Sequence, residues 1–167
     1  QGAGFYPTSN DDELAVGLLL DEATEDNGAL AVLPGSHRGP IHDHYDAQGR
    51  FMGCMRPEEV ERLDRSRAPL LTLSAGSIHI HHYRVVHWSA PNTSPSERRL
   101  LINAYAAADT VSLMADTTGS PHYGRLVRGT PPRVARRTAG EMPLPPDFRE
   151  GYTSIYELQR QAASISP

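Results

Sequence analysis

The stretch GSIHIHHYRVVHWSAPNTSPSERRLLINAY (residues 76–105) contains the pattern on which a fold prediction depends. Residues 76–83 read as one strand and residues 100–105 as a second strand. Between them, His87 precedes a polar turn that contains Ser, Pro and Asn, and Arg98 and Arg99 open the second strand. We therefore expect a histidine at the end of one strand and an arginine at the start of the next.

Histidines are concentrated in this stretch, which contains four of the five that lie between His79 and His122. Because side chains alternate between the two faces of a strand, His79 and His81 share a face and His82 takes the other. A single histidine is more often packed or hydrogen-bonded in a core than bound to a metal. His87 differs in its context, and neutral imidazole is the commonest metal ligand in proteins.

Arg98 and Arg99 are adjacent, so they point to opposite faces of a strand and at most one can enter a barrel. A buried guanidinium without a partner is costly, so the inward arginine requires an anion. The rigid guanidinium fork binds a carboxylate with two hydrogen bonds. Two solvent-exposed arginines at a strand start are the alternative.

The composition limits the class of protein. The 167 residues suffice for one domain with a sizeable core, and the net charge of −4 predicts neither a nucleic-acid nor a membrane partner. The single cysteine, Cys54, excludes an intrachain disulfide and a multi-cysteine metal cage. No apolar run is long enough to span a membrane and no signal peptide is recognisable, so we expect a cytoplasmic location.

The remaining pattern predicts further short strands, at residues 13–21, 29–33 and 70–73. The Asn27-Gly28 turn is expected to join the first two as an antiparallel pair. Helices are expected only at Pro57–Arg67 and Phe148–Ala163, and a long loop at His37–Arg56.

Several short strands with peripheral helices predict an antiparallel sandwich or barrel. We expect a single domain over residues 1–167, with core strands over about 1–109 and a C-terminal loop and helix over 110–167. Residues 1–12 read as a strand end and a turn, so the N-terminal part of the domain is expected to be absent from this chain.

Several motifs in order resemble the phytanoyl-CoA dioxygenase family. They are FYP (5–7), NDD (10–12), LAVG (14–17), Asn27-Gly28, PGSHRG (34–39), HWSAPN (87–92) and Arg98. The resemblance extends from Gln1 to about Asp109. It implies an Fe(II)- and 2-oxoglutarate-dependent oxygenase with an all-β, cupin-like double-stranded β-helix (jelly-roll) core.

The resemblance also assigns roles by position. It implies that His87 binds iron, that Arg98 and Ser89 bind the far carboxylate of 2-oxoglutarate, and that Tyr6 faces the substrate. Two imidazoles and one carboxylate on one face of the iron leave positions for 2-oxoglutarate and O2. The implied function is hydroxylation or another oxidation of a small molecule, in secondary or lipid-like metabolism.

Gly2 occupies the position of a missing ligand. The family's other two ligands come from a His-x-Asp motif, and alignment on Phe5-Tyr6-Pro7 places its Asp at Gly2 and its His immediately before Gln1. A hydroxylase with a local deviation is one explanation. A halogenase, in which chloride takes the vacated position, is the second, because related halogenating enzymes have Gly or Ala there. A member that only binds a ligand is the third.

His44-Tyr45-Asp46 is a second His-x-Asp sequence. Together with His87 it would complete a metal triad. It lies in the long predicted loop, where His and Asp are usually solvated, whereas metal ligands are better held on strand ends. We therefore expect His44 and Asp46 not to be ligands.

Overall fold

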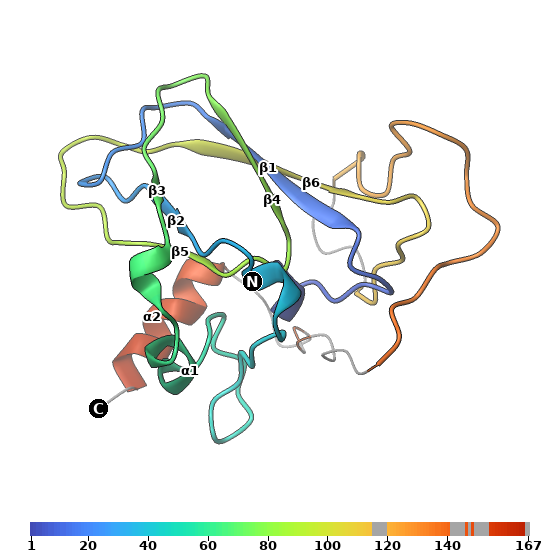
Figure 1. Ribbon diagram of the computed structural model, residues 1–167, viewed down its shortest axis with the longest axis horizontal. Helices are drawn as coiled ribbons and strands as arrows, with labels where there is room; N and C mark the ends of the chain where they lie inside the picture. Colours follow the sequence, from blue (N-terminus) through green and yellow to red (C-terminus); the bar gives the residue numbers. More distant parts are fainter. Residues whose placement is uncertain (115–119, 141–145, 147, 149–153, 166–167) are drawn as a thin grey trace.

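The computed structural model describes residues 1–114, 120–140, 146, 148 and 154–165, and it contains two antiparallel sheets of three strands each (Figure 1). The first sheet has the order β4-β1-β6, with β1 at Glu13–Leu19, β4 at Ile78–His82 and β6 at Leu100–Ala106. The second has the order β3-β2-β5, with β2 at Leu30–Val32, β3 at Leu70–Leu71 and β5 at His87–Ser89.

The chain passes repeatedly from one sheet to the other, because β1, β4 and β6 alternate along the sequence with strands of the second sheet. Strands that alternate between two antiparallel sheets are typical of a jelly roll. The mostly β architecture with few helices is therefore as predicted. The described residues build two three-stranded sheets and do not by themselves complete a jelly roll.

The predicted pairing of residues 13–21 with residues 29–33 is wrong. β1 pairs with β4 and β6, whereas β2 pairs with β3 and β5. The Asn27-Gly28 turn directs the chain into the other sheet. It packs on the segment after β5, where a Cβ on Gly28 would lie 2.6 Å from the carbonyl oxygen of Ala90.

The histidine-rich hairpin also differs from the prediction. β4 ends at His82, and His87 is the first residue of β5 in the opposite sheet. Tyr83, Val85 and Val86 between them are buried, so this corner is anchored in the core. His87 thus lies at the start of a strand rather than at the end of the histidine-rich one.

The N-terminal boundary of the strand region also differs. Residues Gly2–Gly4 form a 3-10 helix, η1, and the first strand begins at Glu13, so the core strands span residues 13–106. The amide of Gly2 donates to the carbonyl oxygen of Tyr83 at 2.7 Å. This bond places the start of the chain beside the corner that follows β4.

The helices lie outside the sheets (Figure 1). Helix α1, Pro57–Glu61, is shorter than predicted and is followed by a 3-10 turn, η3, at Arg65–Arg67. Helix α2 spans Ile155–Ile165, and residues 149–153 of its predicted start lie outside the described residues. Gln159 of α2 donates to the carbonyl oxygen of Gly53 at 2.9 Å, which attaches α2 to the loop before α1. A 3-10 helix, η2, occupies Ser36–Arg38 in the same loop.

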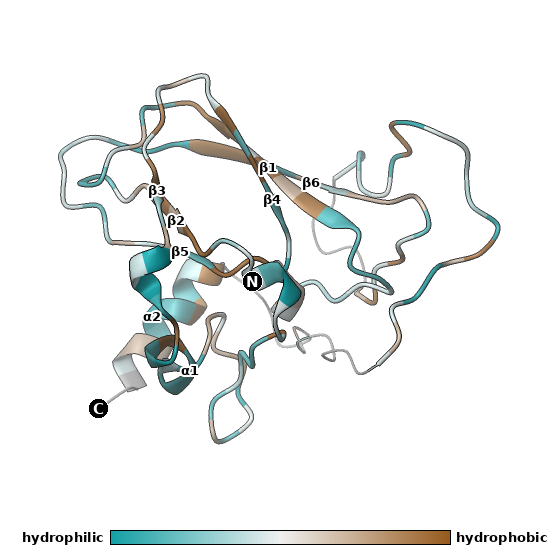
Figure 2. Ribbon diagram, viewed as in Figure 1, coloured by the Kyte–Doolittle hydropathy of each residue, from teal (hydrophilic) through white to brown (hydrophobic). Residues whose placement is uncertain are grey.

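Hydrophobic residues occupy much of β1, β2 and β6 (Figure 2). A core cluster of Leu19, Ala23 and Ala29, with Leu73 and Leu100 packed against it, joins the two sheets at the end of β1. Burial of these apolar side chains is the main contribution that holds this end of the two sheets together.

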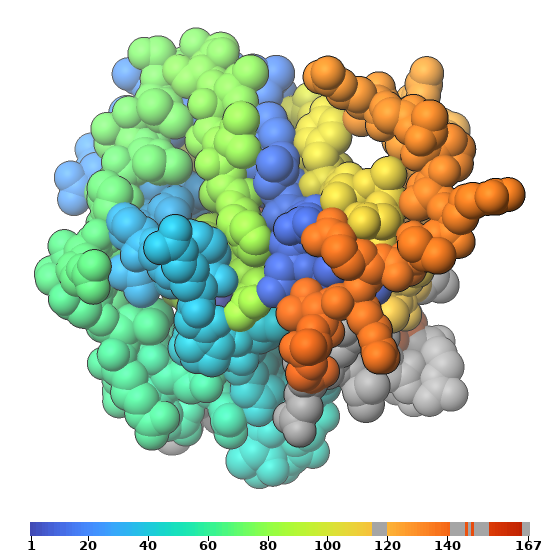
Figure 3. Space-filling model, turned by 45° about the vertical axis from the view of Figure 1, so that its right-hand side comes forward, coloured from blue at the N-terminus to red at the C-terminus, as the bar shows by residue number. Residues whose placement is uncertain are grey.

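The β4-β1-β6 sheet shows an unusual distribution of polar and apolar residues. Its strands lie side by side (Figure 3). Ile78 and Ile80 of β4 are 60% and 65% exposed, whereas His79 between them is only 9% exposed. Buried polar side chains are more informative than exposed apolar ones. The inner face of this sheet is therefore a candidate location for a functional site.

Candidate functional site

Three imidazoles form a row on the inner side of the sheets. The ring centroids of His81 and His87 are 5.0 Å apart, and those of His79 and His81 are 5.4 Å apart. His79 and His81 come from alternate positions of β4, and His87 comes from β5 of the opposite sheet. The row therefore spans the space between the two sheets, and we call it the imidazole row.

His87 has the protonation pattern of a metal ligand. Its Nδ1 lies 2.9 Å from the carbonyl oxygen of Val85, which can only accept, so Nδ1 carries the proton and Nε2 keeps its lone pair. Metal-binding histidines characteristically donate their second ring nitrogen in this way. Burial lowers the pKa of His87 to about 4, so the ring is neutral at physiological pH.

The other two imidazoles of the row lack hydrogen-bond partners at one nitrogen. The Nδ1 atoms of His79 and His81 are buried and unpaired within the described residues. Burial lowers the pKa of both rings, that of His81 to about 4. Two neutral, unsatisfied imidazoles on an inner face indicate a surface made to contact a polar ligand.

Arg98 is directed to the same inner face as this row. It lies two residues before Leu100, which is opposite Leu19 and packs against the core, and His79 is opposite Gly17 on that face of β1. Burial, followed by the positive charge of Arg98, lowers the pKa of His79.

The Nε of Arg98 donates to the carbonyl oxygen of Asn27 at 3.2 Å. Asn27 is buried and its side chain bonds to the backbone of Glu22 and Thr24. A rigid turn thus holds Arg98.

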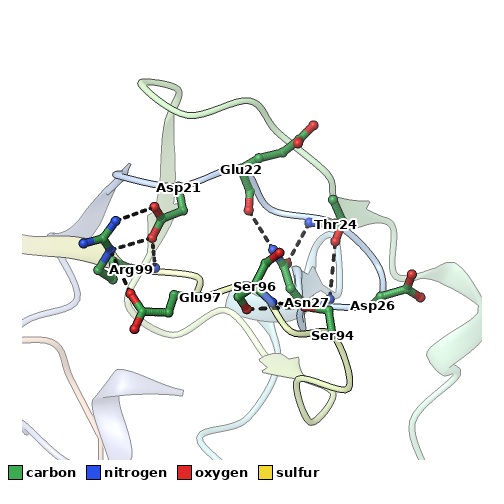
Figure 4. A pocket seen from close by; sticks show the side chains of 9 residues that line it. All are labelled: Asp21, Glu22, Thr24, Asp26, Asn27, Ser94, Ser96, Glu97 and Arg99. Atoms are coloured by element: carbon green, nitrogen blue, oxygen red, sulfur yellow. Dashed lines mark hydrogen bonds and ion pairs between the residues drawn. The ribbon is translucent and has the colours of Figure 1, made fainter.

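Arg99 has a different environment (Figure 4). Its guanidinium binds Asp21 through Nε and Nη2, each at 2.8 Å, and its Nε lies 3.4 Å from Glu97. These residues line an acidic surface hollow in which neither His87 nor Arg98 takes part. Arg99 is therefore engaged at the surface, and Arg98 is the arginine near the imidazole row.

The three other predicted site residues differ in their surroundings. Ser89 shares the face of β5 with His87 by strand alternation and is exposed. Tyr6 is 47% exposed, next to Phe5. Gly2 lies against Tyr83, where an added Cβ would be 3.2 Å from the Tyr83 carbonyl oxygen.

The His and the Asp of the second His-x-Asp sequence lie in different environments. His44 is 3% exposed, packs against Phe5 and Phe51, and donates from Nδ1 to the carbonyl oxygen of His42 at 2.8 Å. Asp46 binds Arg50 at the surface with a distance of 2.7 Å. His44 has a packing role and Asp46 shapes its own turn.

The resident metal that the resemblance implies is not accommodated by these residues alone. Among residues that the structure describes, no three His, Cys, Asp or Glu side chains lie close enough together to hold a metal ion. His87 fits as one ligand. The set of three is incomplete in the described parts of this chain.

His79 and His81 were not among the site residues predicted from the sequence. In β4 the exposed positions are Ile78 and Ile80, whereas His79 is buried and His81 is half-buried, the reverse of the usual pattern. The sequence alone does not show which face of β4 is the inner one, because the isoleucines and the histidines alternate with the same period.

No helix of the described residues is long and apolar enough to cross a membrane.

Comparison with known proteins shows the family to which this chain belongs. Residues 1–100 match the phytanoyl-CoA dioxygenase (PhyH) family. A probable alpha-ketoglutarate-dependent hypophosphite dioxygenase of Stutzerimonas stutzeri is 37% identical over 162 residues, which cover 96% of this chain and 57% of that protein. An ectoine dioxygenase of Bordetella bronchiseptica is 29% identical over 144 residues, 80% of this chain and 44% of that protein.

Among solved structures, EvdO2 from Micromonospora carbonacea var. aurantiaca is similar, with a TM-score of 0.51 and 30% identity over 64% of this chain and 44% of EvdO2. The chain thus spans little more than half the length of the hypophosphite dioxygenase and less than half that of the other two proteins. The match to the family covers most of the sheet region, from η1 to the start of β6. The chain belongs to the phytanoyl-CoA dioxygenase family.

Proposed function

We propose that this protein is a non-haem Fe(II)- and 2-oxoglutarate-dependent dioxygenase that oxidises a small molecule. The observation that carries the proposal is the row of imidazoles that begins at His87, with a free Nε2, and lies on the inner face to which Arg98 is directed. One end of this row suits a metal and the other suits a carboxylate. Family membership and the similarity to an alpha-ketoglutarate-dependent enzyme support it.

Each site residue has a defined task in this proposal. His87 offers Nε2 as one iron ligand, while its bond to Val85 fixes the ring. Arg98 binds the far carboxylate of 2-oxoglutarate, because a guanidinium fork can form two charge-assisted hydrogen bonds to it. Ser89 supports that carboxylate with its hydroxyl group, and Tyr6 contacts the substrate. Bound iron would supply the oxidative chemistry, and the protein would position the reactants.

The test is turnover by the purified protein. Succinate formation that requires both Fe(II) and 2-oxoglutarate is expected, with hypophosphite as the first substrate to try because of the similar enzyme. Calorimetric titration with 2-oxoglutarate measures binding separately. Absence of both binding and succinate would overturn the proposal. Binding without turnover on any substrate would support the third alternative, a member that only binds its ligand.

A halogenase is the second candidate, and Gly2 favours it. Gly2 offers no carboxylate at the position to which the resemblance assigns a metal ligand. The amide of Gly2 donates to the carbonyl oxygen of Tyr83, so this part of the chain lies beside the corner between β4 and His87. Product analysis by mass spectrometry with and without chloride separates the two reactions, and a product without chlorine excludes the halogenase.

A further inference from the structure

We infer that His79 is a second residue that binds the far carboxylate of 2-oxoglutarate, together with Arg98, and that Gly17 is present to make room for its ring. This inference rests on the proposed function. It adds a binding residue that belongs to none of the motifs by which the chain resembles its family.

The position of His79 depends on a missing side chain. Gly17 of β1 is opposite His79 of β4 in the strand register. A Cβ on Gly17 would lie 2.1 Å from Nε2 and 2.5 Å from Cε1 of His79. Two atoms cannot approach so closely, so any other residue at position 17 would push the ring away. The φ angle of Gly17 is not in the left-handed region, so space rather than backbone conformation requires glycine here.

The buried ring has an unused polar atom. His79 is only 9% exposed, and its Nδ1 is buried. This nitrogen has no hydrogen-bond partner within the described residues. Leaving a buried polar atom unpaired is unfavourable, and native structures rarely do so without a reason. A ligand oxygen at Nδ1 would satisfy it.

The charge state of His79 suits a place next to an arginine. Burial, followed by the positive charge of Arg98, lowers the pKa of the ring, so the imidazole is neutral and does not repel the guanidinium. A neutral imidazole with its proton on Nδ1 can donate to a carboxylate oxygen. Arg98 supplies the charge, and His79 supplies one directed hydrogen bond.

The order of residues along the row agrees with this role. His87 is near His81, and His81 is near His79. Arg98 is on the same inner face as His79, because Leu100, two residues after Arg98, is opposite Leu19, and His79 is opposite Gly17. A ligand that has one end at His87 and its far carboxylate at Arg98 therefore passes along the row. The end at Arg98 is the one that meets His79.

The key variants are His79→Phe, which keeps a flat ring without nitrogen, and Gly17→Ala, which displaces the ring. The matched control is His82→Phe, because His82 is in the same strand but on the opposite face, where its ring lies 5.3 Å from that of His37. Circular dichroism and thermal unfolding establish that each variant is folded.

Calorimetric titration with 2-oxoglutarate is expected to give a dissociation constant about tenfold higher for both variants than for the wild type. In turnover, the KM for 2-oxoglutarate should rise by more than kcat falls, and His79→Gln should recover part of the affinity. The control should bind as the wild type does. Wild-type affinity in folded His79→Phe would overturn the inference.

A measurement without any variant covers the case in which these proteins do not fold. With 15N-labelled histidine in the wild-type protein, 2-oxoglutarate is expected to shift the ring-nitrogen signal of His79. A wild-type protein that binds 2-oxoglutarate without this shift contradicts the inference alone. A wild-type protein that does not bind 2-oxoglutarate contradicts the proposed function.

Discussion

Arg99 binds Asp21 with two guanidinium nitrogens on the outer surface, each 2.8 Å from a carboxylate oxygen. Its neighbour Arg98 makes no ion pair to an acidic side chain in the described part of the chain. It donates to the carbonyl oxygen of Asn27 and is directed to the inner face that carries His79. The strand alternation that separates two adjacent arginines thus leaves one guanidinium for a ligand. Arg99 is already paired with Asp21 at the surface, so Arg98 is the arginine that can bind a ligand.

Arg98→Ala is expected to weaken 2-oxoglutarate binding by about 10- to 100-fold, because it removes charge-assisted hydrogen bonds to the far carboxylate. Titration calorimetry measures the dissociation constant. Arg99→Ala is the matched control and should leave it unchanged, since exposed ion pairs contribute little to stability. Equal affinities of the wild type and Arg98→Ala would remove Arg98 from the site.

His87→Ala is expected to abolish iron retention, because it removes the one ligand that the described residues supply. Metal analysis after gel filtration measures the iron-to-protein ratio. His82→Ala, on the other face of the preceding strand, should retain as much iron as the wild type. A His87→Ala protein that still held stoichiometric iron would refute the assignment of His87.

Gly4→Ala is expected to destabilise the fold by about 1–3 kcal/mol, because overpacking forces neighbouring groups to move. An added Cβ would lie 2.4 Å from Nδ1 of His44, which is buried. Urea unfolding measures the change. In the double variant Gly4→Ala/His44→Ala the clash is absent, so the two effects should not add; additive effects would show that the ring moves aside without cost.

Stability is expected to fall with acidification through the buried histidines. Burial lowers the pKa of His44 from 6.5 to about 4, so between these values the unfolded chain binds a proton and the folded chain does not. The free energy of unfolding contributed by His44 therefore falls as the pH decreases from about 6.5 to about 4. In His44→Phe the slope of this free energy against pH should be smaller, as measured by urea unfolding at several pH values.

Glu13 should act in the opposite direction. Burial raises its pKa from 4.5 to about 7, so the folded state keeps the proton that the unfolded chain releases. Its contribution is present below pH 4.5 and is lost as the pH rises to about 7. Glu13→Gln should remove this loss, so stability should rise more steeply with pH in that range; an unchanged slope would show that Glu13 is solvated.

Gly2→Asp tests the vacated ligand position. If Gly2 takes the place of a metal-binding aspartate, the new carboxylate should tighten iron binding and suppress chloride incorporation into any product. The Cβ would lie 3.2 Å from the Tyr83 carbonyl oxygen, so a loss of about 1–3 kcal/mol in stability is also expected. Gly2→Ala has the same Cβ without the carboxylate and is the control; identical iron affinities of the two variants would count against this position.

Much of the strand content could be predicted from the sequence, because a short apolar run that is bounded by the turn-forming residues Gly, Pro or Asn is a local signal. β1, β4 and β6 lie where the runs at residues 13–21, 76–83 and 100–105 predicted strands. Strand pairing was not predictable in the same way. The Asn27-Gly28 turn is typical of a hairpin, yet here it packs against Ala90 and sends β2 into the other sheet.

The family, the β-rich class and the opposite orientation of Arg98 and Arg99 follow from the sequence, because motifs, strand lengths and side-chain alternation are properties of neighbouring residues. The row of His79, His81 and His87, the ion pair of Asp21 with Arg99, and the space at Gly17 for the His79 ring appear only once the chain is folded. These relationships join residues from different strands and sheets. They depend on which segments the burial of apolar side chains brings together, and that is a property of the whole chain.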